Sequence, residues 1–349
     1  MNFASDNTGP AHPRVLQAVM EANAGDAVPY GNDPVTQQAR AAVRALFEAP
    51  DATVEFVATG SAANALALAC LVQPWEGIFC HRVAHVEQDE CGAPEFYSNA
   101  KLLLIDGADA KMTPDALASA IRAASDRGVH GVQPGAVTIT NITERGTVYT
   151  LDEIRALTDV ARAHELPVHL DGARFANACA ALGCSPAEMT WKAGVDAVSF
   201  GGTKNGCMGV EAVVLFDAAK GRELELRRKR GGHLFSKHRY LSAQMGAYCA
   251  GDLWREMGTA ANARMAQLVQ GLARVSGAHV CHPVAGNLGF LDLPRAAHDR
   301  AFAAGAQYNT SPGGAMERAG PDDAVRCRIV CDWSKTGAEV EALLTAWAG

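Results

Sequence analysis

The sequence predicts an α/β fold in which helices cover both faces of a mainly parallel sheet. Short β-rich runs alternate with amphipathic helical patterns through the first two thirds of the 349 residues. Several of these runs are almost continuously apolar, as expected for strands that are buried on both faces. Alternating strands and helices are typical of doubly wound sheets. Ligands bind such sheets beyond the carboxyl ends of the strands, so we expect functional residues directly after strands.

Composition and start signals define the expected elements of this sheet. The expected strands are 54–58, 102–105, 136–142, 167–170, 197–200 and 212–216. The expected helices are 13–22, 35–47, 62–71, 114–124 and 151–163. Thr113 caps a helix whose first residue is a proline. Two further helix starts, Thr150 to Glu153 and Ser185 to Glu188, match the capping box.

The pattern changes after about residue 217. A basic stretch is followed by a long helical region, two more strands and a final helix, at 227–230, 240–275, 288–293, 326–331 and 337–348. Strands with flanking helices predict a smaller α+β domain. We therefore expect a large domain over 1–235 and a C-terminal domain over 236–349.

Composition and charge favour small-molecule chemistry. The formal net charge of -7 gives no reason to expect nucleic acid or an anionic membrane as partner. The ten cysteines are scattered, without a CxxC pair or zinc spacing, so we expect neither disulfides nor a metal site. No apolar run reaches the ~18 residues of a membrane span, and the N-terminus does not resemble a signal peptide. These features predict a soluble, cytoplasmic protein.

Lys204 follows the expected strand 197–200 in the segment Ser199-Phe-Gly-Gly-Thr-Lys-Asn-Gly206. Glycines allow the backbone to approach a bound group closely. A lysine in such a pocket can become a desolvated, nucleophilic amine. The alternative is a surface lysine at an ordinary strand exit.

A second segment, Thr59-Gly-Ser-Ala-Ala-Asn64, follows the first strand and opens a helix. Free N–H groups and the positive end of the helix dipole suit a phosphate there, and Ser61 adds a hydroxyl. Neither GxGxxG nor GxxxxGK[ST] occurs, which disfavours dinucleotide and nucleoside-triphosphate binding. The alternative is a plain helix cap.

Two further segments contain candidate ligand-binding side chains. In His169-Leu-Asp-Gly-Ala-Arg174, Asp171 can hold a protonated ring nitrogen and Arg174 can face a carboxylate, or the two can simply pair to tie a loop. His85 can stack on an aromatic cofactor, act as a base or be structural. A phosphate site, an acid and a lysine, each after a strand, are together what pyridoxal phosphate requires.

With these motifs the sequence resembles the fold-type I pyridoxal-phosphate enzymes, and more narrowly the low-specificity L-threonine aldolases of the β-eliminating lyase group. The resemblance runs over nearly the whole chain, through segments 5–8, 30–34, 59–64, 84–85, 89–90, 169–174 and 202–204. It implies a seven-stranded, mainly parallel sheet. It also implies retro-aldol Cα–Cβ cleavage of L-threonine, L-allo-threonine and related β-hydroxy-α-amino acids, such as phenylserine, to glycine and an aldehyde.

The resemblance also implies roles for individual residues. Lys204 would form the Schiff base with the cofactor, Asp171 would face the pyridine nitrogen and His85 would stack on the ring. The other cofactor-binding residues would be Gly60, Ser61, Ala62, Thr203 and Arg174. The substrate-binding residues would be Ser5, Tyr30, Arg174 and Arg328, with Arg326 as a rival of Arg328.

The chain departs from many relatives at Glu144, where they carry a histidine that contacts the substrate hydroxyl. The base for that hydroxyl is therefore His85, Glu144 or an ordered water. Family members commonly share active sites across a homodimer, often within a homotetramer. The basic segments 227–230 and 237–239 would then reach a neighbour's phosphate, or else form a solvated basic face. Tyr30 would enter the adjacent subunit's site.

Three other functions remain as alternatives. Another fold-type I reaction, β-elimination or transamination, uses the same lysine, acid and phosphate site. A non-catalytic or nucleotide-binding α/β protein is a different class, and the set of motifs disfavours it. A D-specific aldolase is disfavoured because those enzymes resemble a barrel fold.

Overall fold

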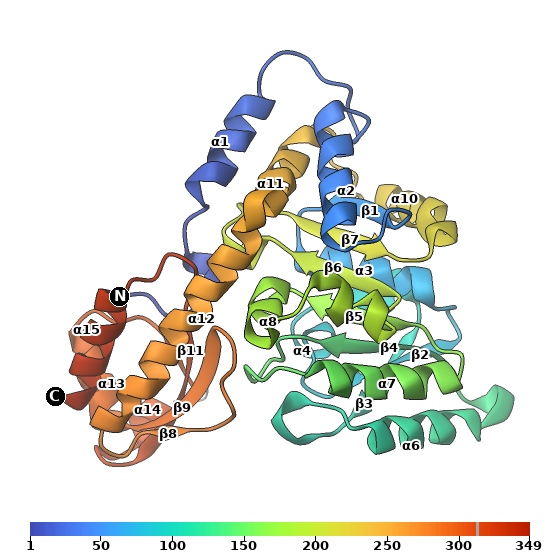
Figure 1. Cartoon of the computed structure of the whole chain (residues 1–349). Helices are drawn as coiled ribbons and strands as arrows, with labels where there is room; N and C mark the ends of the chain where they lie inside the picture. The colour runs from blue at the N-terminus through green and yellow to red at the C-terminus, as the bar shows by residue number, and fades with distance from the viewer. Residues whose placement is uncertain (312–313) are drawn as a thin grey trace.

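The computed structural model describes residues 1–311 and 314–349 and contains two sheets (Figure 1). The larger sheet has seven strands in the order β1-β7-β6-β5-β4-β2-β3, and the smaller has four in the order β10-β11-β9-β8. The predicted α/β class with a mainly parallel seven-stranded sheet is confirmed. No helix in the described parts of the chain is long and apolar enough to span a membrane.

Five adjacent strands of the large sheet are parallel, and the strands at the other edge are antiparallel. Its strands are β1 (Thr53–Val57), β2 (Glu76–His81), β3 (Lys101–Ile105), β4 (Gln133–Thr140), β5 (Val168–Gly172), β6 (Ala197–Gly201) and β7 (Glu211–Leu215). β7 pairs antiparallel with both β6 and β1. The carboxyl ends of β4, β5 and β6 therefore lie along one edge, where the predicted site residues follow them.

Strand β2 was not predicted. Its sequence, Glu-Gly-Ile-Phe-Cys-His, has a glycine and polar ends, yet every residue from Gly77 to His81 is buried. β2 lies between β3 and β4, with parallel pairing on both sides. Pairing with strands far along the chain thus stabilises a segment whose own composition is a weak signal.

Helices cover both faces of the large sheet, as expected. One face packs against α2 (Pro34–Leu46), α6 (Pro114–Ser125), α7 (Leu151–Ala163) and α8 (Phe175–Leu182), and the other against α3 (Gly60–Leu71) and α10 (Gly221–Arg230). With α1 (Pro13–Ala22), the five predicted helices of this part are confirmed to within two residues at each end. Both predicted capping boxes form, at Thr150 and Ser185.

The C-terminal part places helices against the small antiparallel sheet (Figure 1). Its elements are α11 (Arg239–Cys249), α12 (Leu253–Gly271), β8 (His279–Val280), β9 (Leu288–Pro294), α13 (Arg295–Ala303), β10 (Asn309–Thr310), α14 (Ala315–Arg318), β11 (Ala324–Val330) and α15 (Gly337–Ala348). The helical region expected over 240–275 is confirmed. It is not one continuous α-helix: it is interrupted between α11 and α12, where Gly251 and Asp252 adopt left-handed backbone angles, φ 58° and 60°.

The N-terminus lies beside the small sheet rather than the large one (Figure 1). Asn2 forms a bridge to Gln307, and Phe3 is buried in the core of the C-terminal part. Helix α11, in contrast, packs against α1 and α2 in the core of the large sheet. The domain boundary after residue 235 stays a prediction.

Candidate active site

Lys204 and Asp171 lie at the ends of two adjacent parallel strands. Lys204 is in a 3-10 turn, Thr203–Asn205, that follows β6, and Asp171 is near the end of β5. Burial lowers the pKa of the Lys204 amine, and the nearby Arg174 cation lowers it further. Both effects favour the neutral amine, which is the nucleophilic form.

Asp171 is 1% exposed and holds its carboxylate in two hydrogen bonds. Its Oδ1 atom accepts from the Ala173 backbone N–H at 3.0 Å, and its Oδ2 atom accepts from the Asn64 side-chain amide at 3.1 Å. These two hydrogen bonds satisfy the buried carboxylate and fix its orientation. The Asp–Arg pair that was the alternative for this segment does not form, since Arg174 contacts Asp6 instead.

His85 begins the short helix α4 (His85–Gln88) and is held by Glu90. Its Nδ1 atom and Glu90 Oε1 are hydrogen-bonded at 2.8 Å, and Asn64 donates to the same Glu90 oxygen at 2.8 Å. The hydrogen bond to Glu90 raises the pKa of the imidazole, and burial opposes this. Polar atoms of His85, Glu90 and Asp171 all lie within 4.8 Å of one another, so these side chains form one cluster.

Glu144 lies in the turn after β4 and reaches the same cluster. Its Oε1 atom accepts a hydrogen bond from the His85 backbone N–H at 2.6 Å. Burial raises the pKa of Glu144 to about 7, with a further contribution from the Asp171 charge. The two side chains that the sequence named as candidate bases are therefore neighbours.

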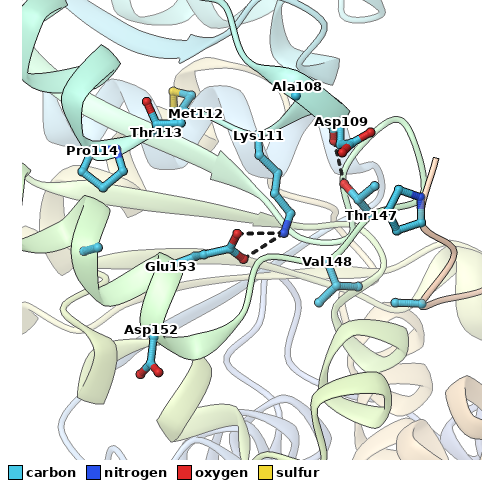
Figure 2. Close-up of a pocket in the computed structure, with 13 residues that line it drawn as sticks. Ala108, Asp109, Lys111, Met112, Thr113, Pro114, Thr147, Val148, Asp152 and Glu153 are labelled. Carbon is cyan, nitrogen blue, oxygen red and sulfur yellow. Dashed lines mark hydrogen bonds and ion pairs between the residues drawn. The ribbon is translucent and has the colours of Figure 1, made fainter.

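The turn that carries Glu144 is anchored at the junction with the C-terminal part. The Thr147 hydroxyl donates to the Asp109 carbonyl oxygen at 2.6 Å (Figure 2). The Asp109 carboxylate in turn contacts His282 Nδ1, in the loop before β9, at 2.8 Å. A pocket of about 630 Å³ opens beside this anchor, and its lining includes none of the predicted site residues.

Helix α3 begins where the sequence predicted a phosphate cradle. Thr59 caps the helix by accepting from the Ala62 N–H at 3.2 Å. The N–H groups of Gly60 and Ser61 come before the first hydrogen bonds within the helix. A Cβ atom on Gly60 would meet nothing within 4 Å, so the space next to this backbone is open. Thr203 is another predicted cofactor-binding residue, and its hydroxyl accepts a hydrogen bond from the Val210 N–H at 3.1 Å.

Arg174 is paired with Asp6 from the N-terminal segment. Its Nε and Nη2 atoms donate to the two Asp6 oxygens at 2.7 and 3.0 Å, and Asn287 also donates to Asp6, at 3.1 Å. The sequence named Arg174 but assigned Asp6 no role. Asp6 precedes Arg174 by 168 residues, so only the folded chain brings them together.

Arg326 and Arg328 on β11 have different surroundings. Arg326 forms two hydrogen bonds of 2.9 Å with Asp292, and its side chain is 49% exposed. Arg328 donates to the Ala4 carbonyl at 3.3 Å, and its Nε atom is buried without a partner among the described residues. Burial lowers the pKa of Arg328, as does Arg174, which places Arg328 next to the candidate site.

The side chains of Ser5 and Tyr30 form no hydrogen bond with the described residues of the cluster of His85, Glu90 and Asp171. Ser5 caps the turn Asp6–Thr8 by accepting from the Asn7 N–H at 3.1 Å. Tyr30 is exposed, its ring lies under the Lys229 ammonium at 5.1 Å, and its N–H donates to the Ser236 carbonyl.

The two basic segments are only partly exposed. Arg228 is 3% exposed and pairs with Glu55 at 2.7 Å, and His238 is 1% exposed. These two residues therefore do not belong to a solvated face, and contact of these segments with a neighbour's phosphate stays a prediction. Lys229, Arg230 and Lys237 are exposed.

Four buried polar residues of the candidate site had no predicted role: Asp6, Asn64, Glu90 and Glu211. The first three stand in the segments that carry the family resemblance, which was the available signal. Glu211, on β7, accepts from the Gly202 N–H at 3.1 Å, and burial raises its pKa to about 7.

Comparison with known proteins agrees with this geometry. The family described as beta-eliminating lyase matches residues 2–294. The low specificity L-threonine aldolase of Pseudomonas aeruginosa is 41% identical over 334 residues, which cover 95% of this chain and 92% of that protein. That of a Pseudomonas species is 39% identical, over 98% of this chain and 95% of its own.

Solved structures also match over the full length. The threonine aldolase of Leishmania major superposes with a TM-score of 0.91 and 26% identity, over 99% of this chain and 98% of that chain. Aspartate aminotransferase of Thermus thermophilus, at 14% identity and a TM-score of 0.68, shares the fold. The chain thus belongs to the β-eliminating lyase family, within its low-specificity L-threonine aldolases, as its motifs predicted.

Proposed function

We propose that the protein is a pyridoxal-phosphate-dependent aldolase. It cleaves L-threonine, L-allo-threonine and related β-hydroxy-α-amino acids, such as phenylserine, to glycine and an aldehyde. The observation that carries this proposal is the desolvated Lys204 amine beside the buried Asp171 carboxylate, in a chain 41% identical to a low specificity L-threonine aldolase.

The side chains present fit the cofactor. Lys204 offers the amine that would attach to it, and Asp171 offers a buried, hydrogen-bonded carboxyl group that would face the ring nitrogen. The start of α3 offers N–H groups next to open space at Gly60 and the Ser61 hydroxyl for a phosphate. When bound, pyridoxal phosphate supplies the electron sink for the carbanion that Cα–Cβ cleavage leaves behind.

Arg328 and Arg174 would orient the substrate carboxylate. Arg328 has a buried Nε donor without a partner among residues 1–311 and 314–349, and its guanidinium carries a charge near Arg174. A carboxylate between them would relieve the repulsion of two cations and satisfy that donor. Arg326 is a poorer candidate because its Nε and Nη2 atoms already donate to the two Asp292 oxygens.

Glu144 would take the proton of the substrate β-hydroxyl, with His85 beside it. A carboxyl with a pKa of about 7 is partly ionised near neutral pH, where it can both accept and return a proton. The His85 N–H fixes one Glu144 oxygen and leaves the other free to face a substrate. His85 would stack on the cofactor ring.

A product assay separates this function from its alternatives. Purified protein with L-threonine should form acetaldehyde and glycine in equal amounts. An ammonia-releasing reaction would indicate β-elimination, and an oxo acid formed together with an amine on the cofactor would indicate transamination. Lys204→Ala is the control and should lose both the visible absorbance of the bound cofactor and the turnover.

We also propose that the protein works as a homodimer or homotetramer with shared active sites, in the cytoplasm. Exposed apolar side chains at Met20, Val28, Tyr30 and Phe235 support a partner surface. All ten cysteines are free, which suits a reducing compartment. Mixing inactive Lys204→Ala and Tyr30→Ala subunits tests the sharing, because mixed dimers would regain one intact site. Recovery of no activity after proven subunit exchange would contradict it.

A further inference from the structure

The Asn64 side chain connects two buried carboxylates, Asp171 and Glu90. The proposed reaction gives a role to Asp171 but none to Glu90 or to the connection between them. Its amide nitrogen donates to Asp171 Oδ2 at 3.1 Å and to Glu90 Oε1 at 2.8 Å. An amide nitrogen has two N–H donors and no acceptor, so both donors are used on anions. Glu90 then continues the chain of hydrogen bonds to His85 Nδ1, at 2.8 Å.

The burial of Glu90 is not explained by an ion pair that stabilises the fold. The Glu90 side chain is 0% exposed. The ionisable side chain with which it pairs is His85, which is 34% exposed. Glu90 Oε2 and Asn64 Oδ1 are both buried without a hydrogen-bond partner among the described residues. Unsatisfied buried polar atoms cost stability, so their presence here calls for another reason.

We propose that Asn64 and Glu90 are positioning residues that set the charge and orientation of His85 and Asp171. Glu90 keeps a proton on His85 Nδ1 and fixes the plane of the ring. Asn64 separates the two carboxylates and holds Asp171 in the orientation that would face the ring nitrogen. The inference rests on the proposed cofactor site.

The charges around His85 agree with this assignment. The carboxyl groups of Glu90, Asp171 and Glu144 lie around His85, and the Lys204 amine is the nearby basic group. Among these, Glu90 makes the hydrogen bond to the ring itself, and it has the largest effect in raising the pKa of His85. Removing its charge should therefore change the protonation of His85 more than removing a carboxylate that does not touch the ring.

Glu90→Gln tests the charge because glutamine keeps the size of the side chain and one acceptor oxygen. Losing this carboxylate disfavours the protonated form of the His85 imidazole, to which Glu90 is hydrogen-bonded. We expect the pH midpoint of the His85 ring resonances, followed by NMR in the holoenzyme, to fall by about one unit. Glu87→Gln is the matched control: it removes a carboxylate from α4, the short helix that begins at His85, without a hydrogen bond to the ring, and its midpoint should equal that of the wild type.

A double-mutant cycle tests whether Glu90 acts through His85. In a His85→Asn background, Glu90→Gln should no longer change kcat for aldol cleavage, because the group on which it acts is gone. A full change in kcat in that background, or an unchanged His85 midpoint in Glu90→Gln, would overturn the inference. If the wild type lacked the visible band and the aldol cleavage, the proposed function itself would fail instead.

Asn64→Ala tests the other half of the pair. Without the amide, Asp171 loses one of its two hydrogen-bond donors, and no donor separates it from Glu90. We expect the dissociation constant of the cofactor, measured by fluorescence titration of cofactor-free protein, to rise roughly tenfold, the loss of a hydrogen bond to a charged group. Unchanged cofactor affinity in a folded Asn64→Ala protein would contradict this role.

Discussion

Replacing Glu144 with glutamine should remove the base of the reaction without removing its hydrogen bond to His85. The Glu144 carboxylate accepts from the His85 N–H at 2.6 Å, and the glutamine oxygen can do the same. What is lost is the ability to hold a proton. General bases contribute about 10²–10⁴ in rate, so kcat for L-threonine should fall by at least about a hundredfold.

The pH dependence gives the sharper test. Burial raises the pKa of Glu144 to about 7, and Asp171 adds to this. The ionised form is the active base, so wild-type kcat should fall by about tenfold for each pH unit below 7 and level off above it. In Glu144→Gln this acidic limb should disappear, and the remaining activity should be flat across neutral pH.

The measurement is acetaldehyde release at saturating L-threonine from pH 5.5 to 9, with the visible absorbance confirming that each variant holds its cofactor. A Glu144→Gln enzyme with turnover within about threefold of the wild type, and with the acidic limb intact, would refute the assignment. The proton would then go to His85 or to a water molecule.

Three further outcomes follow from the same geometry. Lys204→Ala should abolish the visible absorbance and aldol cleavage, which spectroscopy and the product assay measure directly. Arg328→Leu should raise KM for L-threonine by about ten- to a hundredfold, while Arg326→Leu should change it by less than about twofold, because Asp292 occupies Arg326. Thr147→Val removes the donor to the Asp109 carbonyl and should lower the free energy of unfolding by about 1–3 kcal/mol in urea titrations, with a larger loss in kcat than in cofactor binding.

The sequence predicted the elements whose signals are local. Thr150 and Ser185 form their capping boxes, and the last helix begins and ends at Gly337 and Ala348 as expected. The exceptions needed long-range information. Strand β2 is defined by its neighbours β3 and β4, and the break after α11 depends on left-handed angles at residues 251 and 252 that the sequence signals only weakly.

The candidate site divides in the same way. Lys204 and Asp171 were predictable because they stand at the carboxyl ends of adjacent strands. Parallel strands bring these ends together. The partners that set their charge were not. Asp6, Asn64 and Glu90 come from the N-terminal segment, a helix and a loop, and their effect depends on distances of about 3 Å that only the folded chain defines.

The two site arginines illustrate why those partners matter for function. Arg174 uses two nitrogens on Asp6, the first residue of the turn that follows Phe3 and packs against the turn of Lys204. Arg328 holds that same segment by the Ala4 carbonyl, and its Nε atom has no partner in the part of the chain that the structure describes. We therefore expect a substrate carboxylate to bind first to Arg328, where it displaces no carboxylate. Beside burial, which has the larger effect, the Arg174 charge lowers the pKa of Lys204 and favours the reactive amine.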